Sequence, residues 1–431
     1  MFKPRREALM QALGGGVAIF PANPERRRTA DLDYPYRQHS DFFYLTGYTE
    51  PDSVLVLMPD HPDYRMVLFV RPRDPEMETW NGRRAGIEGA IRDFGADAAF
   101  PIDQIDQILP RYLEGQTRLH YRMGEHGAFD ERVLGWVNAA RRKARSGVGA
   151  PTEILDPSRV LHEMRLFKSD EELDLMRRSA DIAAAGHVAA MQVCRPGGHE
   201  YELEATLLHA FRMAGAMGPA YGCIVGSGEN GCILHYHENE APLRDGDLVL
   251  IDAGAEYRHY ASDITRTFPV NGRFTDTQRA VYQVVLDAQK AAIEVIRPGR
   301  TFQDVHDVAL RVLVEGLVSL GILEGRVEDL IEDGAYRPFY MHKTSHWIGI
   351  DVHDVGAYKQ GNAWRKLEPG MVLTVEPGLY FARGGPEAAR AFEGIGIRIE
   401  DDVVVTAEGH EVLTHGVPKD IAAIEHLMGQ A

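Results

Sequence analysis

The segment Ile251–Phe268, IDAGAEYRHYASDITRTF, has the pattern of two β-strands separated by a break, and each strand carries an aspartate. The first run, LVLID, ends at Asp252, and the second apolar run contains Asp263. Both runs are predicted to be at least half-buried, because they are rich in apolar and β-branched residues. An ionised carboxylate in such a place costs several kcal/mol unless a partner compensates its charge. Two partners are possible: a salt bridge, with Arg266 as the candidate cation for Asp263, or a metal ion.

The composition is that of a large, acidic, globular protein. The 431 residues exceed one ordinary core, so two or three domains are expected. The net charge of −17 argues against nucleic acid or an anionic membrane as the main partner. The three cysteines form no CxxC pair, and the N-terminal apolar stretch is interrupted by Glu7 and Gln11. We therefore expect a cytoplasmic protein without a signal peptide, a disulfide framework or a bilayer-spanning segment.

The chain divides into two predicted domains, 1–160 and 161–431. The first alternates strand-like runs, VLVLMPD and MVLFVRP, with charged helical segments, which is typical of an α/β domain. The Gly/Pro/Ser-rich stretch Ser146–Ser158 is interpreted as a linker. A capping box, Ser169–Glu172, then opens a long helix that stops at Arg195–Gly197.

The second domain repeats itself. A second capped helix begins near Thr275 and also ends at an Arg-Pro-Gly, and each Arg-Pro-Gly is followed by an amphipathic helix. The segment Leu243–Asp252 aligns without a gap on Leu367–Glu376, so each half has a strand closed by a carboxylate. Each half then supplies a second acid-bearing strand, with Asp263 in one and Glu400 in the other. A pseudo-twofold arrangement of the halves would bring four carboxylates together.

Those four carboxylates, Asp252, Asp263, Glu376 and Glu400, cannot all remain ionised side by side in an apolar setting. Divalent cations would remove the repulsion, and two of them about 3.5–4 Å apart form a known catalytic arrangement. The sequence therefore favours a dinuclear metal site over the single salt bridge.

Two histidine clusters lie just before the acid-bearing strands. ILHYHENE contains His235 and His237, and MHKTSHWIGIDVHD contains His342, His346 and His353. His346 adjoins an apolar run and is expected to be buried, where a neutral imidazole suits a site made otherwise of oxygens. His237 would face away from His235 on a strand, and it is left out of the site. A hydrogen-bonded core histidine is the alternative for each one alone, but their repeated placement favours a site.

The order Asp252, Asp263, His346, Glu376, Glu400 resembles that of the pita-bread metallopeptidases. Within them, the motifs IVGSGENGCILHY, DITRTFPVNG, SHWIGIDVHDVG, VLTVEPGLYF and GIGIRIEDD look like aminopeptidase P. DFFYLTGYTEPDSVLVL looks like the N-terminal domain of that family, so the resemblance covers nearly the whole chain. It implies an α/β (α+β) fold, in which an N-terminal creatinase-like α/β domain precedes a pita-bread catalytic domain with an internal pseudo-twofold repeat.

The resemblance also implies an activity and a metal content. The family removes an N-terminal residue when proline follows it, so the expected substrates are peptides with proline in second position. Two divalent ions are implied, with Mn²⁺ fitting this ligand set best and Co²⁺ or Zn²⁺ possible. A homo-oligomer, a tetramer or a dimer, is implied as well.

The site residues receive roles by the same resemblance. Asp263, His346 and Glu400 would hold one metal, Asp252 would chelate the other, and Glu376 would complete the set, with Asp263 and Glu400 bridging. The two ions would share a hydroxide that attacks the scissile carbonyl, while Glu376 carries its proton to the leaving nitrogen.

Four further residues are expected to support that chemistry. His353 and His235 would donate hydrogen bonds to the substrate carbonyl or the developing oxyanion. His342 would line the proline pocket. Arg398, two residues before Glu400, would orient metal-bound carboxylates. A structural salt bridge is an equally supported role for Arg398, and the two roles do not exclude each other.

Other readings remain open. Prolidase, an Xaa-Pro dipeptidase, shares the fold and all five ligands, and metal-free binding proteins of the same fold exist. The pair Lys343-Thr344 departs from the sequence pattern of the family at this position, and this departure bears on the substrate range. Enclosure by the N-terminal domain or a neighbouring subunit would make the enzyme an exopeptidase by shape. Trp80 is a candidate wall residue unless it packs in its own domain, and Asp41 or the metal ligands could pair with the substrate amine.

Overall fold

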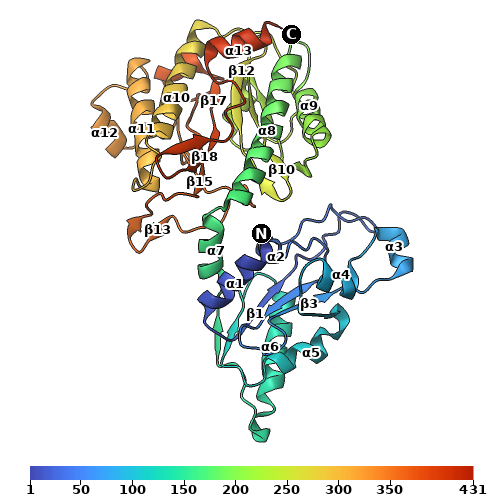
Figure 1. The fold of residues 1–431 in the computed structure, drawn as a ribbon. Coiled ribbons are helices and arrows are strands. Elements are labelled where there is room, and N and C mark those ends of the chain that lie inside the picture. Colours follow the sequence, from blue (N-terminus) through green and yellow to red (C-terminus); the bar gives the residue numbers. More distant parts are fainter. Residues whose placement is uncertain (431) are drawn as a thin grey trace. The chain divides into compact units, whose positions relative to one another are not determined.

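The computed structural model describes residues 1–430, and the chain forms two compact units, Met1–Met164 and Arg165–Ala431 (Figure 1). The helix α7 (Ser158–Leu166) carries the chain from the first unit into the second. Among the described helices, none combines the length and the apolar composition that a bilayer span requires. All three cysteines are free thiols.

The first unit is built on a six-stranded sheet with the strand order β4-β3-β2-β1-β5-β6. Its strands are β1 (Val17–Pro21), β2 (Val54–Leu57), β3 (Met66–Val70), β4 (Ala98–Pro101), β5 (Arg118–His120) and β6 (Glu153–Leu155). Its helices are α1 (Phe2–Leu13), α2 (Ser40–Thr46), α3 (Pro75–Asn81), α4 (Gly86–Arg92), α5 (Ile105–Tyr112) and α6 (Gly127–Arg141), with 3₁₀ turns η1 (Ile102–Gln104) and η2 (Ala144–Ser146). Antiparallel pairs join β1 to β2 and β2 to β3, and the remaining neighbours are parallel.

One face of this sheet packs against α5 and α6. Val17 and Ile19 alternate on β1, and they share a buried cluster with Leu109 of α5 and Trp136 of α6. Reading the stretch Ser146–Ser158 as a linker was partly wrong. It contains β6, which pairs in parallel with β5 as an edge strand. A strand of three residues between prolines is too short to stand out from the turn residues around it.

The second unit places two helix pairs around short strands. Its helices are α8 (Asp170–Val193), α9 (Glu200–Met213), α10 (Asp276–Glu294), α11 (Phe302–Ser319), α12 (Val327–Glu332) and α13 (Ile421–Met428), with 3₁₀ turns η3 (Gly228–Cys232) and η4 (Glu387–Phe392). Its strands are β7 (Gly218–Pro219), β8 (Ile224–Ser227), β9 (Leu248–Asp252), β10 (Ala255–Tyr257), β11 (Tyr260–Ala261), β12 (Thr265–Pro269), β13 (Lys359–Gln360), β14 (Ala363–Trp364), β15 (Val372–Val375), β16 (Gly378–Tyr380), β17 (Gly396–Arg398), β18 (Asp401–Val405) and β19 (His410–Val412). Figure 1 shows α8 and α9 on one side of these strands and α10 and α11 on the other.

The predicted internal repeat is confirmed down to single hydrogen bonds. In the first half, the backbone N–H of Gly197 donates to the carbonyl of Leu243 at 2.9 Å. In the second half, Gly299 donates to Leu367 at 3.0 Å. Both glycines have positive φ, +92° and +87°, which explains why each Arg-Pro-Gly turn ends in glycine. The two matched turns thus tie each helix pair to the start of its acid-bearing strand.

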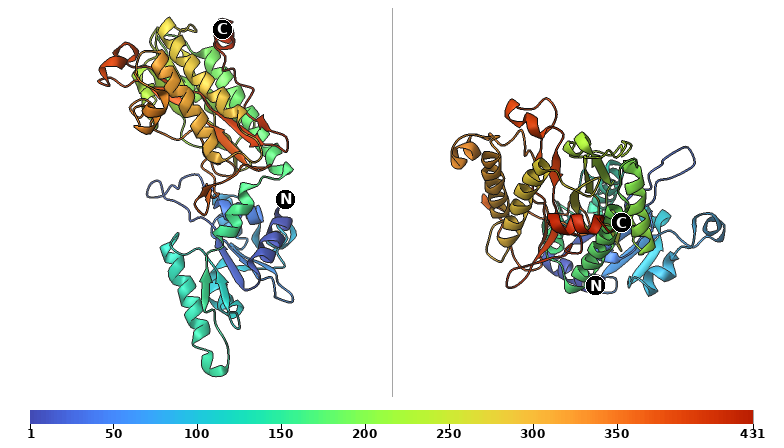
Figure 2. Two further views of the ribbon diagram at one scale, coloured as in Figure 1. Left: turned by 90° about the vertical axis from the view of Figure 1, so that its left-hand side faces the viewer. Right: turned by 90° about the horizontal axis from the view of Figure 1, so that it is seen from above.

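The two halves meet along their second strands. β9 pairs antiparallel with β12 in one half, as β15 does with β18 in the other. Across the junction, the N–H of Glu400 donates to the carbonyl of Thr265 at 3.0 Å, and the N–H of Arg398 donates to Thr267 Oγ1 at 3.2 Å. In the left view of Figure 2, the gold and orange helices α10 and α11 lie over the red strands of the C-terminal half. The acid-bearing strand ends therefore converge between the helix pairs.

The close approach of α10 and α11 predicts a sensitive glycine. A Cβ on Gly316 of α11 would lie 2.1 Å from Val284 Cγ1 of α10. We expect Gly316→Ala to lower the free energy of unfolding by about 1–3 kcal/mol through overpacking. Gly135 of α6 is the control, since its Cβ would meet nothing within 4 Å. Gly135→Ala should be neutral or stabilising by up to about 1 kcal/mol. Denaturant unfolding of both variants measures the contrast, and equal effects would contradict it.

Candidate metal centre

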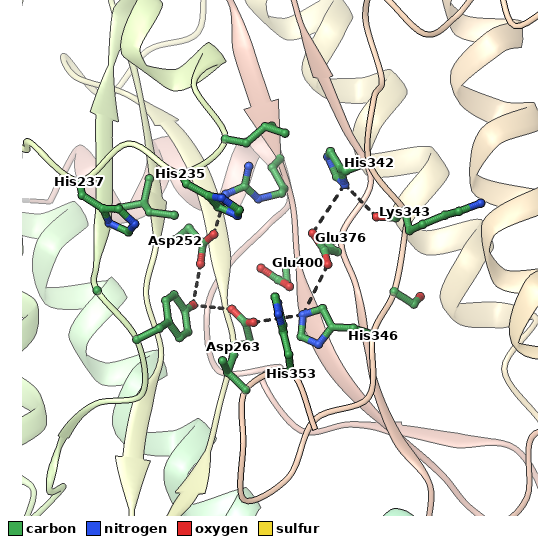
Figure 3. Close-up of a pocket in the computed structure, with 17 residues that line it drawn as sticks. His235, His237, Asp252, Asp263, His342, Lys343, His346, His353, Glu376 and Glu400 are labelled. Carbon is green, nitrogen blue, oxygen red and sulfur yellow. Dashed lines mark hydrogen bonds and ion pairs between the residues drawn. The ribbon is translucent and has the colours of Figure 1, made fainter. Parts of the chain in front are cut away.

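The converging strand ends line a cavity of about 490 Å³ in the second unit. Figure 3 shows the four acids and His346 turned toward one another, with His235 and His342 on opposite sides of them. All nine site residues that the sequence predicts line this cavity: His235, Asp252, Asp263, His342, His346, His353, Glu376, Arg398 and Glu400. Its remaining walls include Tyr221, Ile224, Leu234, His237, Lys343 and Val352.

Strand register explains why the four acids are neighbours. Asp252 is the last residue of β9 and lies opposite Thr265 of β12, two residues after Asp263. Glu376 directly follows β15, and Glu400 directly precedes β18. The last register pair of those two strands is Val375 with Asp401, so Glu376 and Glu400 emerge side by side. Each half thus delivers two carboxylates at the end of one antiparallel strand pair.

His346 is oriented as a metal-ligating imidazole would be. Its Nδ1 lies 3.0 Å from the carbonyl oxygen of Trp347, which can only accept a hydrogen bond, so Nδ1 carries the proton. Nε2 then faces the acids, 3.5 Å from Asp263 Oδ2 and 3.6 Å from Glu376 Oε1. A hydrogen bond to the second ring nitrogen is the usual companion of metal ligation. Single ligand atoms of Asp263, His346 and Glu400 all lie within 4.8 Å of one another.

The charge balance of the centre fits bound cations. Burial raises the pKa of Asp252 and Glu400, and it raises that of Glu376 to about 7. Burial acts against protonated His346, but Asp263 and Glu376 outweigh it and raise its pKa to about 9. Arg398 compensates one acid, with its Nη2 2.6 Å from Asp252 Oδ2. The remaining carboxylates and the oriented imidazole form the oxygen-rich donor set with one nitrogen that hard or borderline divalent ions prefer.

Two hydroxyl groups in the centre were not predicted from the sequence. The Tyr221 hydroxyl lies 2.6 Å from Asp252 Oδ1, and it also contacts Asp263 Oδ1. Thr265 Oγ1 donates to Glu400 Oε2 at 2.6 Å. The sequence around Tyr221 contains no pattern that indicates a site residue. Tyr221 reaches the acids from the segment before β8. These hydroxyls orient carboxylate oxygens that would otherwise face one another unpartnered.

The histidines around the acids differ in the protons that they can offer. His353 lies against His346, with ring centroids 4.2 Å apart, and burial lowers its pKa. His342 Nδ1 donates to the carbonyl of Lys343 at 2.8 Å, so its Nε2 accepts from the Tyr380 hydroxyl at 2.8 Å. Burial and then Arg398 lower the pKa of His342 to about 3. His342 is therefore neutral, and both of its nitrogens are engaged by the protein.

The expectation that His237 points away from the cavity was wrong. His237 lines it together with His235 (Figure 3). The alternation rule was misapplied, because residues two apart on a strand face the same side, and residues 233–240 form no strand in any case. A loop can direct both side chains to the same side.

The salt-bridge alternative for Asp263 is also wrong. Arg266 points the other way, and its Nη2 lies 2.7 Å from Asp401 Oδ1, with both side chains fully buried. Consecutive residues on a strand face opposite sides, which separates Arg266 from the acids. The cation needed at Asp263 must come from elsewhere.

Two residues with predicted roles at the active site, Trp80 and Asp41, belong to the first unit. Trp80 lies in the short helix α3, not in a loop, and it is 78% exposed. It does not fill a core of its own domain, while its role as a wall of the active site stays a prediction. Asp41 is buried, and its Oδ2 lies 3.1 Å from His162 Nε2. That carboxylate is already engaged, which weakens the suggestion that it pairs with a substrate amine.

The chain matches two family descriptions, one in each part. Residues 2–121 match the aminopeptidase P N-terminal domain, and residues 174–407 match metallopeptidase family M24. Xaa-Pro aminopeptidase of Escherichia coli is 50% identical over 429 residues, covering 99% of this chain and 97% of the relative. Human Xaa-Pro aminopeptidase 3 is 32% identical and covers 99% of this chain and 83% of the relative.

Solved structures agree with these sequence matches. Aminopeptidase PepP of Pseudomonas aeruginosa superposes with a TM-score of 0.98 at 52% identity, covering all of this chain and 97% of that one. A zinc-substituted E. coli aminopeptidase P in complex with product superposes with a TM-score of 0.96 at 49% identity, covering all of this chain and 98% of that one. The mixed α/β fold, the two family matches and the full-length relatives lead to one conclusion: the chain belongs to the aminopeptidase P family of M24 metallopeptidases.

Proposed function

We propose that the chain is a metal-dependent Xaa-Pro aminopeptidase, which hydrolyses the bond between an N-terminal residue and a following proline. The observation that carries this function is the convergence of four carboxylates with one oriented imidazole, His346, in a single cavity. The full-length Xaa-Pro aminopeptidase relatives support the same reaction class, a metallo-exopeptidase hydrolase.

Divalent ions belong to the M24 family, and we propose two of them here, most favourably Mn²⁺, with Co²⁺ or Zn²⁺ as substitutes. Asp263, His346 and Glu400 would hold one ion, Asp252 would chelate the second, and Glu376 would complete the set. Asp263 and Glu400 would bridge. Bound there, such ions would supply Lewis acidity and activate water at neutral pH.

Glu376 is suited to move the proton between the attacking water and the leaving nitrogen. Its pKa, raised to about 7 by burial, lies close to neutral pH, where an acid–base group is most effective. Thr374 Oγ1 donates a hydrogen bond to Glu376 Oε1 at 3.4 Å and restrains the carboxylate. Arg398 donates a hydrogen bond to Asp252 and is not required to touch the substrate.

The cavity histidines would divide the work of binding. His353 is neutral at pH 7 because burial lowers its pKa, so it can offer one N–H to the substrate carbonyl oxygen. His235 would act in the same way. His342 has no N–H left to offer, because Lys343 and Tyr380 engage both nitrogens, and its ring would instead form a flat wall of the proline pocket.

The proposal also covers the domain boundaries, the location and the oligomeric state of the chain. We take residues 1–160 as the N-terminal domain and 161–431 as the catalytic domain, which the two contact units and the two family matches support. A cytoplasmic dimer or tetramer is the proposed working form. The net charge of −17 disfavours nucleic acid and anionic membranes as partners.

Hydrolysis of an Xaa-Pro-Xaa tripeptide tests the function. We expect release of the first residue in the presence of Mn²⁺ and none after chelation. The N-acetylated tripeptide, and an internal Xaa-Pro bond in a longer peptide, should resist. Cleavage of Xaa-Pro dipeptides alone would instead identify a prolidase. A chain that binds no divalent ion and cleaves neither substrate would be a binding protein.

Mutation should distinguish a metal ligand from a histidine that binds only the substrate. Asp263→Ala is expected to lose both bound metal and activity, because a bridging ligand serves two ions. His353→Ala should keep its metal and lose about 10²–10³-fold in turnover, the usual cost of one oxyanion donor. Elemental analysis and tripeptide kinetics on both variants check this. Metal loss in His353→Ala, or an active Asp263→Ala with two ions, would overturn the assignment.

Metal binding should release protons. Below its pKa of about 9, His346 is protonated in the metal-free protein, and below about 7 so is Glu376. A metal needs both groups deprotonated, so its affinity should rise with pH from about 6 to about 9. Calorimetric titration in two buffers of different ionisation heat measures the protons released. An affinity independent of pH over this range would contradict the expectation.

A further inference from the structure

A second cluster of potential metal ligands lies in the first unit, within residues 1–164. One ring nitrogen each of His39 and His126 and one carboxylate oxygen of Glu125 lie within 4.8 Å of one another. All three side chains line a small cavity together with Asp41 and Arg122. The cluster joins two segments 86 residues apart, the residue before α2 and the residues before α6.

The distances suit a small cation. His39 Nε2 and Glu125 Oε1 are 3.2 Å apart. Ligands at 2.0–2.1 Å from a tetrahedral Zn²⁺ are separated by about 3.3 Å, so this pair already has the spacing of two such ligands. The third group must approach by little more than a side-chain adjustment. Among residues 1–430, His126 Nε2 is buried and finds no hydrogen-bond partner, which is costly for an imidazole nitrogen without a ligand.

The local charges also favour a cation. Glu125 brings one acid to the cavity wall. Asp41 adds a second acid to the cavity wall, where His162 contacts it at 3.1 Å. Arg122 is the opposing charge, but its Nε lies 3.8 Å from Glu125 Oε2, leaving Oε1 to face His39. An outer cation on the second oxygen would orient the carboxylate rather than occupy the site.

Neither histidine is used as a helix cap. His39 precedes α2 and His126 precedes α6, and neither side chain caps its helix. Two imidazoles and one carboxylate are the donor set of three-ligand zinc sites, in which water takes the fourth position.

We propose that His39, Glu125 and His126 form a Zn²⁺ site in the N-terminal domain, separate from the catalytic centre. Its imidazole content selects zinc over the harder ions that the oxygen-rich centre accepts. The Glu125 side chain is about one-third exposed, so the site is open to solvent and can exchange its metal. The ion would link the start of α2 to the start of α6 and stabilise the first unit.

The zinc content of full-length variants tests this proposal. In an Asp263→Ala background, which weakens the catalytic centre, we expect one more zinc per chain than in the same protein carrying His126→Ala. The comparison is made by elemental analysis after zinc loading and gel filtration in metal-free buffer. His209→Ala is the matched control, because His209 is an exposed histidine on α9 of the other unit. It should change nothing.

Two further measurements keep the test decisive. Zinc should raise the melting temperature of the first unit in the parent protein and not in the His126→Ala variant. Should His126→Ala fold poorly, Glu125→Gln preserves size and is expected to weaken zinc binding at least tenfold. Introduced into the wild-type chain, both substitutions should leave the turnover of the manganese-loaded enzyme unchanged. Equal zinc in the parent and in folded His126→Ala, or no zinc-dependent stabilisation of the parent, would overturn the site.

Discussion

The mutual repulsion of four closely spaced carboxylates, two of them buried, is the constraint on which the catalytic unit depends. Asp252, Asp263, Glu376 and Glu400 are held at the ends of two antiparallel strand pairs, where the backbone fixes them before any ligand arrives. Such a cluster is stable only if donors and cations surround it. One guanidinium, two hydroxyls and one imidazole do so in part, and the remaining negative charge defines what the cavity can bind.

The internal repeat places the four acids symmetrically, but the side chains around them differ between the two halves. Each half gives one carboxylate at the end of its first strand and one shortly before its second strand, and each half is anchored by an equivalent Arg-Pro-Gly turn. Only the second half contributes His346 and Arg398, and only the first contributes Tyr221. The four acids therefore differ in their partners, so that one can carry protons while the others hold charge.

Hydrogen bonds within the second half give its three cavity histidines different roles. His346 gives its Nδ1 proton to its neighbour's carbonyl and keeps Nε2 for the acids. His342 is fixed at both nitrogens, whereas His353 is not held in this way by the hydrogen bonds of the centre. The residue type alone is the same in all three cases. The difference lies in which acceptor the fold places beside each ring.

Local patterns were sufficient wherever the structural cause was itself local. Capping boxes, Arg-Pro-Gly turns and strand-closing acids predicted the repeat, because each depends on residues a few positions apart. Prediction failed where that assumption broke. His237 was excluded although residues two apart on a strand share a face, and its segment is in fact a loop. The short strand β6 is hidden among turn residues. Arg266 faces Asp401, a partner 135 residues away.

The sequence by itself determined the family, the order of the five expected ligands and the two halves that carry them. Only the tertiary structure decided that Tyr221 bridges two of the acids, that His346 presents Nε2, and that His39 meets Glu125 and His126 in the first unit. The physical reason is that strand and turn preferences act along the chain, whereas these contacts form when distant elements dock. Their geometry depends on how whole strands and helices pack, and no short stretch of sequence records it.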